Sequence, residues 1–206
     1  MIDCLIFAGS ELNISNFEKS KYSNAFVICA DRGLLHAQAL GIKPNLAVGD
    51  FDSLKYSPQE CETLRFPTEK DDTDLLIAVK EAIKRGFKNI DILGALGGRV
   101  DHMYGNIQVL SYACDNNANA HLISDDDIVS VYSPGTYAIP KLEGYSLSLF
   151  SYSTSVENIC ISGTLYQLNN GIINNSFPIG ISNVIVDDNA LISFSDGKLL
   201  VIQSKL

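Results

Sequence analysis

Short apolar runs and helical stripes alternate along the first two-thirds of the chain. Apolar runs of strand length cover residues 3–8, 25–30, 45–49, 63–66, 89–95 and 120–124. Between some of these runs, apolar residues recur at helical spacing over residues 33–41, 75–86 and 102–114. Because strands that alternate with helices favour a mainly parallel sheet covered by helices, we predict an α/β domain over residues 1–135.

The pattern changes after Pro134 and Gly135. The later apolar runs are short and rich in β-branched residues, and they cover residues 146–152, 158–163, 183–188, 190–195 and 198–203. No helical stripe is visible there, and "SDGK" at 195–198 is typical of a hairpin turn. We therefore predict a small antiparallel β domain over residues 136–206.

Composition narrows the class of protein. The 206 residues are 46% apolar, which is enough for a substantial core, and no run of 18 uncharged apolar residues predicts a membrane span. The start of the chain carries Asp3 where a secretory signal would be basic, and five cysteines are scattered without a CxxC pair. We expect reduced thiols in a cytoplasmic protein. The net charge of −9, without a basic patch, argues against nucleic-acid binding.

Acidic residues follow successive strands of the predicted parallel sheet. Asp31 follows the second apolar run, Asp50 and Asp52 follow the third, and Asp74 and Asp101 follow the fourth and fifth. In an open parallel sheet, ligands bind beyond the carboxyl ends of the strands. These carboxylates would then share one edge, together with Lys70 and Arg99.

Two interpretations of this acidic edge are open. Asp31, Asp74 and Asp101 are well placed to cap or charge the first turns of helices, and the Asp50–Asp52 segment is compatible with a turn. Helix capping does not, however, require four successive strand ends to be acidic. The functional interpretation is a Mg²⁺ site, because Mg²⁺ prefers carboxylate oxygens combined with substrate phosphates.

In the functional interpretation, Asp50, Asp52 and Asp74 hold the metal. Arg99 meets phosphate oxygens as a fork and Lys70 as a point charge. Gly97 and Gly98 would let the backbone approach a ligand closely. The chain has no GxxxxGK[ST] loop, so phosphate binding would depend on other devices.

Four segments in order resemble the motifs of the thiamine pyrophosphokinase family. They are "ADRG" (30–33), "GDFDSL" (49–54), "EKDDTDLLIAV" (69–79) and "LGALGGRVDHMYGNI" (93–107). The resemblance covers nearly the whole chain and is strongest over residues 30–107. It implies an α/β nucleotide-binding domain, a C-terminal antiparallel β-sandwich domain that binds thiamine, and a homodimer. It also implies transfer of the diphosphate of ATP to the hydroxyl of thiamine, with release of AMP.

The resemblance also implies roles for individual residues. Asp50, Asp52 and Asp74 would bind Mg²⁺. Contacts with nucleotide phosphates, or placement of the thiamine hydroxyl, would fall to Asp31, Lys70, Thr73, Arg99 and Asp101. In the second domain, "SGTLYQL" (162–168) is similar to an aromatic-bearing strand of the family, with Tyr166 as the aromatic residue. "GISNV" (180–184) is similar to a Ser-Asn motif near the thiamine ring, which implies roles for Ser182 and Asn183.

Three alternatives share part of this pattern. A related pyrophosphokinase that acts on another alcohol, such as a hydroxymethyl pterin, would have the same acidic edge. A nucleotide-sugar glycosyltransferase would explain Asp50 and Asp52 but not "GGRVDH" or "EKDDTD". A non-catalytic module would bind a magnesium nucleotide without turnover.

Overall fold

The chain forms two compact units, which are residues 1–125 and 126–206. The computed structural model describes residues 2–13, 17–51, 61–66 and 71–206. The strand at residues 127–132 groups with the second unit, whereas the sequence-based division at 135/136 places it in the first. The assignment of catalysis and thiamine binding to residues 1–135 and 136–206 stays a prediction.

The first unit contains a parallel sheet with strand order β4-β3-β2-β1-β5-β6. This confirms the α/β prediction. Its elements are β1 (Cys4–Phe7), η1 (Lys19–Tyr22), β2 (Phe26–Ala30), α1 (Gly33–Ala39), β3 (Leu46–Gly49), β4 (Glu62–Arg65), α2 (Asp74–Lys84), β5 (Asn89–Leu93), α3 (Val100–Asp115) and β6 (Asn119–Ile123).

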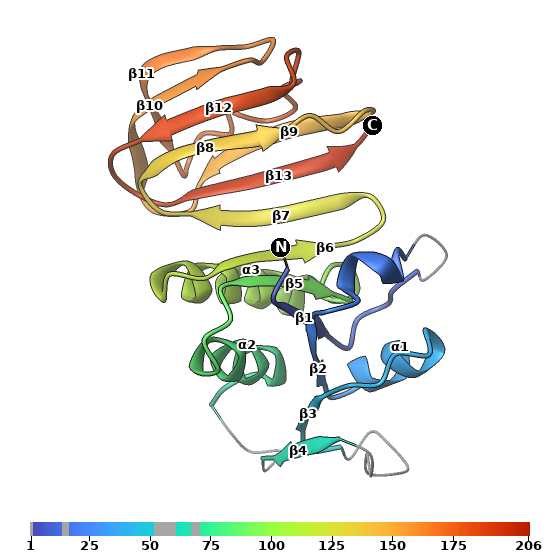
Figure 1. Cartoon of the computed structure of the whole chain (residues 1–206). Helices are drawn as coiled ribbons and strands as arrows, with labels where there is room; N and C mark the ends of the chain where they lie inside the picture. The colour runs from blue at the N-terminus through green and yellow to red at the C-terminus, as the bar shows by residue number, and fades with distance from the viewer. Residues whose placement is uncertain (1, 14–16, 52–60, 67–70) are drawn as a thin grey trace. The chain divides into compact units, whose positions relative to one another are not determined.

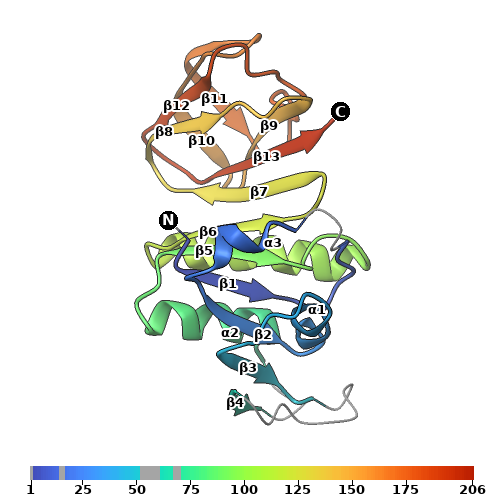
Figure 2. The ribbon, with the colours of Figure 1, turned by 45° about the vertical axis from the view of Figure 1, so that its right-hand side comes forward.

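Helices cover both faces of this sheet, as Figures 1 and 2 show: α2 and α3 lie on one face and α1 on the other. The inner strands β1 and β3 are buried along their whole length, which is the pattern expected of a parallel sheet covered on both sides. On the α1 face, Leu34 and Ala37 pack in one cluster with Leu5 and Phe7 of β1. Both faces of the sheet are therefore buried in the core, and the ends of the strands are the parts of the sheet that a ligand can reach.

The second unit is a β-sandwich, as predicted. One of its layers has the antiparallel strand order β7-β13-β9, and the other has the order β11-β10-β12-β8. A single apolar cluster fills the space between the layers, and it includes Ile139, Leu147, Ile159 and Val201. The strands are β7 (Asp127–Tyr132), β8 (Gly135–Pro140), β9 (Tyr145–Ser151), β10 (Ser155–Ser162), β11 (Leu168–Asn174), β12 (Asn189–Phe194) and β13 (Leu199–Lys205).

Two details of the predicted β domain are wrong. "SDGK" at 195–198 does not close a hairpin, because β12 pairs with β10 and β8 whereas β13 pairs with β7 and β9. The segment instead carries the chain from one layer to the other. Residues 183–188 form only isolated bridges, Leu147 with Asn183 and Thr164 with Ile185, rather than a strand.

The sandwich core provides a test of packing. Ile159 in β10 is fully buried, whereas Ile172 in the neighbouring strand β11 is 58% exposed. We expect Ile159→Ala to lower the free energy of unfolding by about 2–5 kcal/mol, because it removes buried methyl groups and leaves a cavity. Ile172→Ala, the matched control, should change it by less than about 0.5 kcal/mol. Urea denaturation measures both, and equal effects would contradict the packing described.

Candidate active site

The carboxyl edge of the parallel sheet brings several predicted residues into one row. Asp31 directly follows β2 and Asp50 directly follows β3. A further hydrogen bond holds these two strand ends together: the Asp31 backbone N–H donates to the Val48 carbonyl at 2.8 Å. In the strand order, the direction of progression reverses between β1 and β5, and such a switch point is where ligands bind in open α/β sheets. Asp52 and Lys70 lie outside the described residues.

Backbone strain is concentrated in the predicted motifs. Six described non-glycine residues have positive φ, and three of them lie in these motifs. They are Asp31 (φ 44°), Phe51 (φ 60°) and Ser182 (φ 56°). Such a conformation is unfavourable for a residue with a Cβ and tends to persist where a functional site requires it. The strain therefore supports the functional interpretation over simple capping.

The start of α2 places two further predicted residues. Thr73 is the N-cap, and its Oγ1 accepts a hydrogen bond from the Leu76 backbone N–H at 3.2 Å. The same hydroxyl retains its own proton, which it can donate to a phosphate oxygen. Asp74 is the first residue of the helix and lies in its first turn. A helix N-terminus favours negative charge, so this position suits both the carboxylate and a nearby phosphate.

The loop between β5 and α3 is held against the end of β1. The Ser10 N–H donates to the Gly94 carbonyl at 2.7 Å, and a Cβ at Gly94, which has φ 70°, would lie 2.7 Å from the Ala8 carbonyl oxygen. From α3, Asn106 Nδ2 donates to the Ala95 carbonyl at 2.8 Å. The sequence indicates no role for Asn106, although this residue lies within the segment at 93–107 that resembles the family. It fixes the base of the glycine-containing segment that leads to Arg99.

Arg99 and Asp101 form a forked ion pair at the start of α3. Arg99 Nε and Nη2 donate to the two carboxylate oxygens of Asp101 at 3.1 and 2.6 Å, and the two side chains are 73% and 63% exposed. The guanidinium lowers the pKa of the Asp101 carboxyl, and the His102 backbone N–H at 2.9 Å adds to this effect. The same contact raises the pKa of Arg99, which therefore stays protonated. The pair is a charged fork that faces solvent, where a phosphate can reach it.

The described residues include part of the predicted metal set. Asp50 and Asp74 supply carboxylate oxygens, which are the donor type that Mg²⁺ prefers. Within the ranges that the structure describes, no group of three or more His, Cys, Asp and Glu side chains is arranged to hold a metal. The third predicted ligand, Asp52, is not among those residues. The proposed ligand set thus stays a prediction, and the donor chemistry of its described members fits it.

In the second unit, Asn183 ties two loops together. Its Oδ1 accepts from the backbone N–H groups of Tyr166 and Val184 at 3.0 and 2.8 Å, and its Nδ2 donates to the Tyr166 carbonyl at 2.7 Å. Its side chain is buried, and its polar atoms are already used within the chain. Tyr166 lies in a bend between β10 and β11 rather than in a strand, so the predicted aromatic-bearing strand is wrong at this residue. Its side chain is exposed, with 69% of the residue accessible.

Ser182 directly precedes Asn183 and lies in a turn. The Ser182 backbone N–H donates to Ser148 Oγ at 3.0 Å. Ser182 is exposed, whereas Asn183 is buried, so the two predicted residues differ in what they offer a ligand. Asn183 holds the backbone of Tyr166 in place. Ser182 and Tyr166 are both exposed, so their side chains are accessible from solvent.

The Arg99–Asp101 pair can be tested directly. We expect Arg99→Met to raise the pKa of Asp101 toward its ordinary value of about 3.9, because the main cause of the lowered pKa is removed. Arg85→Met, which breaks the ion pairs of Arg85 with Glu62 and Glu81 elsewhere in the unit, serves as control and should leave Asp101 unchanged. Carboxyl ¹³C NMR titration measures the pKa. No shift in the Arg99 variant would show that the pair does not form in solution.

Comparison with known proteins gives a consistent result for both units. The catalytic-domain model of thiamin pyrophosphokinases matches residues 17–122, and the model of their vitamin B1 binding domain matches residues 136–199. The thiamine pyrophosphokinase of Bacillus subtilis (strain 168) is 33% identical over 186 residues, which cover 86% of this chain and 86% of that protein.

Solved structures agree over almost the full length. The crystal structure of the thiamine pyrophosphokinase from Bacillus subtilis matches with a TM-score of 0.88 at 29% identity and covers 99% of both chains. A thiamin pyrophosphokinase family protein from Enterococcus faecalis matches with a TM-score of 0.83 at 31% identity, again over 99% of both chains. Together with the family models, these matches show that the chain belongs to the thiamine pyrophosphokinase family.

Proposed function

We propose that this protein transfers the diphosphate of ATP to the hydroxyl of thiamine and releases AMP. The observation that carries the proposal is that Asp31, Asp50, Asp74 and the Arg99–Asp101 pair follow strands that end at one sheet edge, within a chain whose two units both match the family. In the reaction, the hydroxyl oxygen attacks the β-phosphorus and the bond between that phosphorus and the α-phosphate oxygen breaks. Such transfers depend mainly on positioning and charge neutralisation.

Asp50, Asp52 and Asp74 are the residues that would hold Mg²⁺. When bound, the ion neutralises phosphate charge, which no donor group of the protein can do to the same degree. Thr73 Oγ1 and the N-terminus of α2 lie next to Asp74 and would bind phosphate oxygens alongside it. Lys70 would add a further positive charge.

Arg99 and Asp101 would act on the transferred group and the attacking hydroxyl. Arg99 stays protonated and offers a planar fork that fits phosphate oxygens. A lowered pKa makes Asp101 a weak proton acceptor, so we assign it to orienting the thiamine hydroxyl through a hydrogen bond. Asp31, held in a strained conformation at the end of β2, is then the candidate that receives the hydroxyl proton.

The second unit would supply the thiamine contacts. The exposed Tyr166 ring provides a flat surface for stacking on the aromatic rings of thiamine. Asn183 fixes the backbone of Tyr166 through two hydrogen bonds, and Ser182 places a hydroxyl in the adjacent turn. Recognition of thiamine would thus depend on the hydrogen bonds that hold the loop with Tyr166 against the loop with Asn183.

We further propose a homodimer, formed through an apolar loop surface of the second unit. The Leu165 N–H donates to the Val184 carbonyl at 2.8 Å, so the loops at 163–166 and 179–186 run side by side. Both loops expose large apolar side chains besides Tyr166, which are Leu165, Ile179, Ile181 and Val186. Exposed apolar groups that gather in this way mark association surfaces in many proteins.

We also propose a cytoplasmic location. No helix in the described part of the chain is long and apolar enough to cross a membrane. All five cysteines, which fall within the described ranges, are free thiols. Burial raises the pKa of the Cys4 thiol to about 12, so that thiol is unreactive. Free thiols are usual in a reducing compartment.

The reaction is tested with purified protein, ATP, Mg²⁺ and thiamine. We expect AMP and thiamine diphosphate in equal amounts, and Asp50→Asn or Asp74→Asn should lower kcat/KM at least about 100-fold by removing a metal ligand. Asp188→Asn, which changes an exposed carboxylate of the second unit, is the matched control and should keep full activity.

Other outcomes distinguish the alternatives. ADP as product would indicate ordinary kinase chemistry. Turnover with a hydroxymethyl pterin but not with thiamine would favour the related pyrophosphokinase. Binding of magnesium nucleotide without turnover would favour the non-catalytic module.

The dimer is tested by placing a charge in the apolar loop surface. We expect Ile181→Asp to raise the dimer dissociation constant at least about tenfold, because a carboxylate would be buried at the interface without a partner. Leu191→Asp is the control, since Leu191 is similarly exposed, at 53% against 59%, but lies in strand β12. Analytical ultracentrifugation measures both. A monomeric wild-type protein, or a stronger effect at Leu191, would refute this surface.

A further inference from the structure

A hydrogen bond from helix α1 reaches the switch point between β1 and β5. His36 lies in the last turn of α1, and its Nε2 is 2.8 Å from the carbonyl oxygen of Ser10, in the loop that follows β1. A carbonyl oxygen can only accept, so Nε2 of His36 carries the proton and donates it. The His36 side chain is half-buried, and the bond joins residues 26 positions apart.

Ser10 connects this contact to the loop that leads to Arg99. The Ser10 N–H donates to the Gly94 carbonyl at 2.7 Å, directly after β5. The His36 ring also lies against Gly94 itself, because a Cβ at Gly94 would be 3.3 Å from His36 Cδ2. One imidazole therefore contacts both of the loops that leave β1 and β5 at the switch point.

The base of the β5–α3 loop is thus held from two sides. Helix α1 lies on one face of the sheet and α3 lies on the other, as Figures 1 and 2 show. From α3, Asn106 holds the Ala95 carbonyl, and from α1, His36 contacts Gly94. A loop that is fixed at its base presents the residue at its far end in a narrower range of positions, and that residue is Arg99.

Helix α1 also begins beside another residue of the proposed site. Asp31 precedes the helix by two positions, and the helix has only seven residues, Gly33–Ala39. The start of the helix is seated on the end of β1, because a Cβ at Gly33 would collide with the Phe7 carbonyl. His36 therefore joins the short element that begins next to Asp31 to the loop that ends at Arg99.

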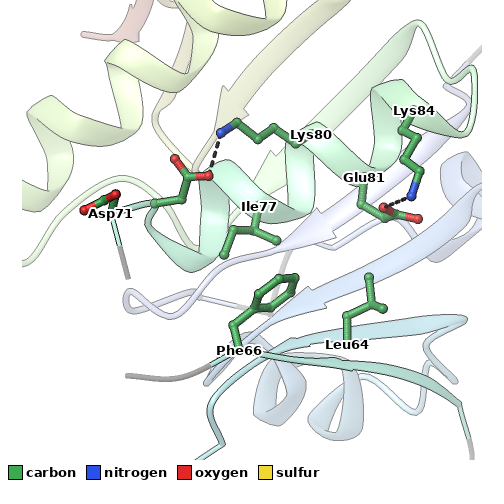
Figure 3. A pocket seen from close by; sticks show the side chains of 8 residues that line it. Leu64, Phe66, Asp71, Ile77, Lys80, Glu81 and Lys84 are labelled. Carbon is green, nitrogen blue, oxygen red and sulfur yellow. Dashed lines mark hydrogen bonds and ion pairs between the residues drawn. The ribbon is translucent and has the colours of Figure 1, made fainter. Parts of the chain in front are cut away.

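The hollow between β4 and α2, drawn in Figure 3, shows a different kind of contact. There Lys84 Nζ lies 3.6 Å from Glu81 Oε2, one turn earlier on the same helix. A pair within one helix stabilises that helix, but it does not relate the helix to neighbouring strand ends. The His36 bond, in contrast, joins separate elements at the edge of the sheet.

We propose that His36 is a positioning residue for the diphosphate transfer. Through Ser10 and Gly94, it sets where the loop places Arg99 relative to Asp31. The inference rests on the proposed function and adds to it a residue that does not touch the substrates. Because Arg99 acts on the group in transfer, loss of the His36 contact should lower kcat rather than raise KM.

The test replaces His36 by leucine and by glutamine. His36→Leu removes the donor, and we expect it to lower kcat about 10- to 100-fold while the KM values for ATP and thiamine stay within about twofold of wild type. His36→Gln keeps an N–H donor on a side chain of similar reach, so it should bring kcat back to within about threefold of wild type. Steady-state kinetics measures both variants.

Lys19→Met is the matched control. Lys19 Nζ donates to the Gly41 carbonyl at 2.9 Å, so this bond also ties the β1–β2 connection to the α1 region. It does so beyond the end of the helix rather than at the switch point. The variant should therefore leave kcat and both KM values unchanged.

Two NMR measurements provide readouts that do not depend on turnover. Imidazole ¹⁵N spectra of the wild-type protein should show that the proton of the neutral His36 ring is on Nε2. In His36→Leu, the Ser10 N–H should exchange with solvent at least about tenfold faster, because the residue that bears it has lost one of its two hydrogen bonds. The Ala8 N–H, which donates to the Leu93 carbonyl at 2.8 Å, should exchange as in the wild type.

The outcomes separate this proposal from the proposed function. If the wild-type protein transfers no diphosphate from ATP to thiamine, the proposed function fails, and the NMR measurements still show whether His36 holds the loop. If transfer occurs but His36→Leu keeps the wild-type kcat, or His36→Gln is as slow as His36→Leu, the positioning role is wrong. If neither variant folds, the wild type decides, because a neutral ring with its proton on Nδ1 would overturn the proposal.

Discussion

The chemistry of this protein depends on the common direction of six strands. Because β1 to β6 are all parallel, each connection must return along a face of the sheet before the next strand begins. The faces are consequently filled by helices, and the carboxyl ends of all six strands meet at one edge. Side chains that are far apart in sequence, such as Asp31 and Asp101, follow strands that end at that edge. A sheet of mixed direction would scatter the same residues over two edges.

This arrangement also explains which parts of the fold sequence reasoning could foresee. The buried parallel strands and the α2 stripe produce local patterns, so the elements of the first unit were predicted to within a few residues. The hairpin at 195–198 failed because Ser195 to Lys198 has the composition of a turn, and composition does not reveal which strands pair. Tyr166 was placed in a strand on resemblance alone. Its backbone is held by the side chain of Asn183, a contact between residues 17 positions apart.

The same distinction applies to the site. Asp74 was foreseeable because an acidic first turn has a local signature, whereas Thr73, which is the N-cap, was named only through the resemblance. The role of Asn106 could not be foreseen, because it consists of one hydrogen bond to the Ala95 carbonyl, 11 positions earlier in the chain. His36 was not foreseen either. A histidine on a short helix has no local signature of a role, and only the tertiary structure shows that its ring reaches the loops after β1 and β5.

The Arg99–Asp101 pair bears on how the site would receive an anion. In the structure the Arg99 guanidinium is paired with the Asp101 carboxylate, and both side chains are mostly exposed. Exposed ion pairs contribute little to stability, so a phosphate can share or replace the carboxylate at small cost. Before a phosphate binds, the ion pair would hold the Arg99 guanidinium at the start of α3. The positive charge of Arg99 would also reduce the electrostatic repulsion between Asp101 and an approaching polyphosphate. Under the proposed function, a phosphate that took the Arg99 fork would leave the Asp101 carboxylate able to accept a hydrogen bond from the thiamine hydroxyl. A single exchange, in which Arg99 leaves Asp101 for a phosphate of ATP, would then both bind ATP and make Asp101 available to the thiamine hydroxyl.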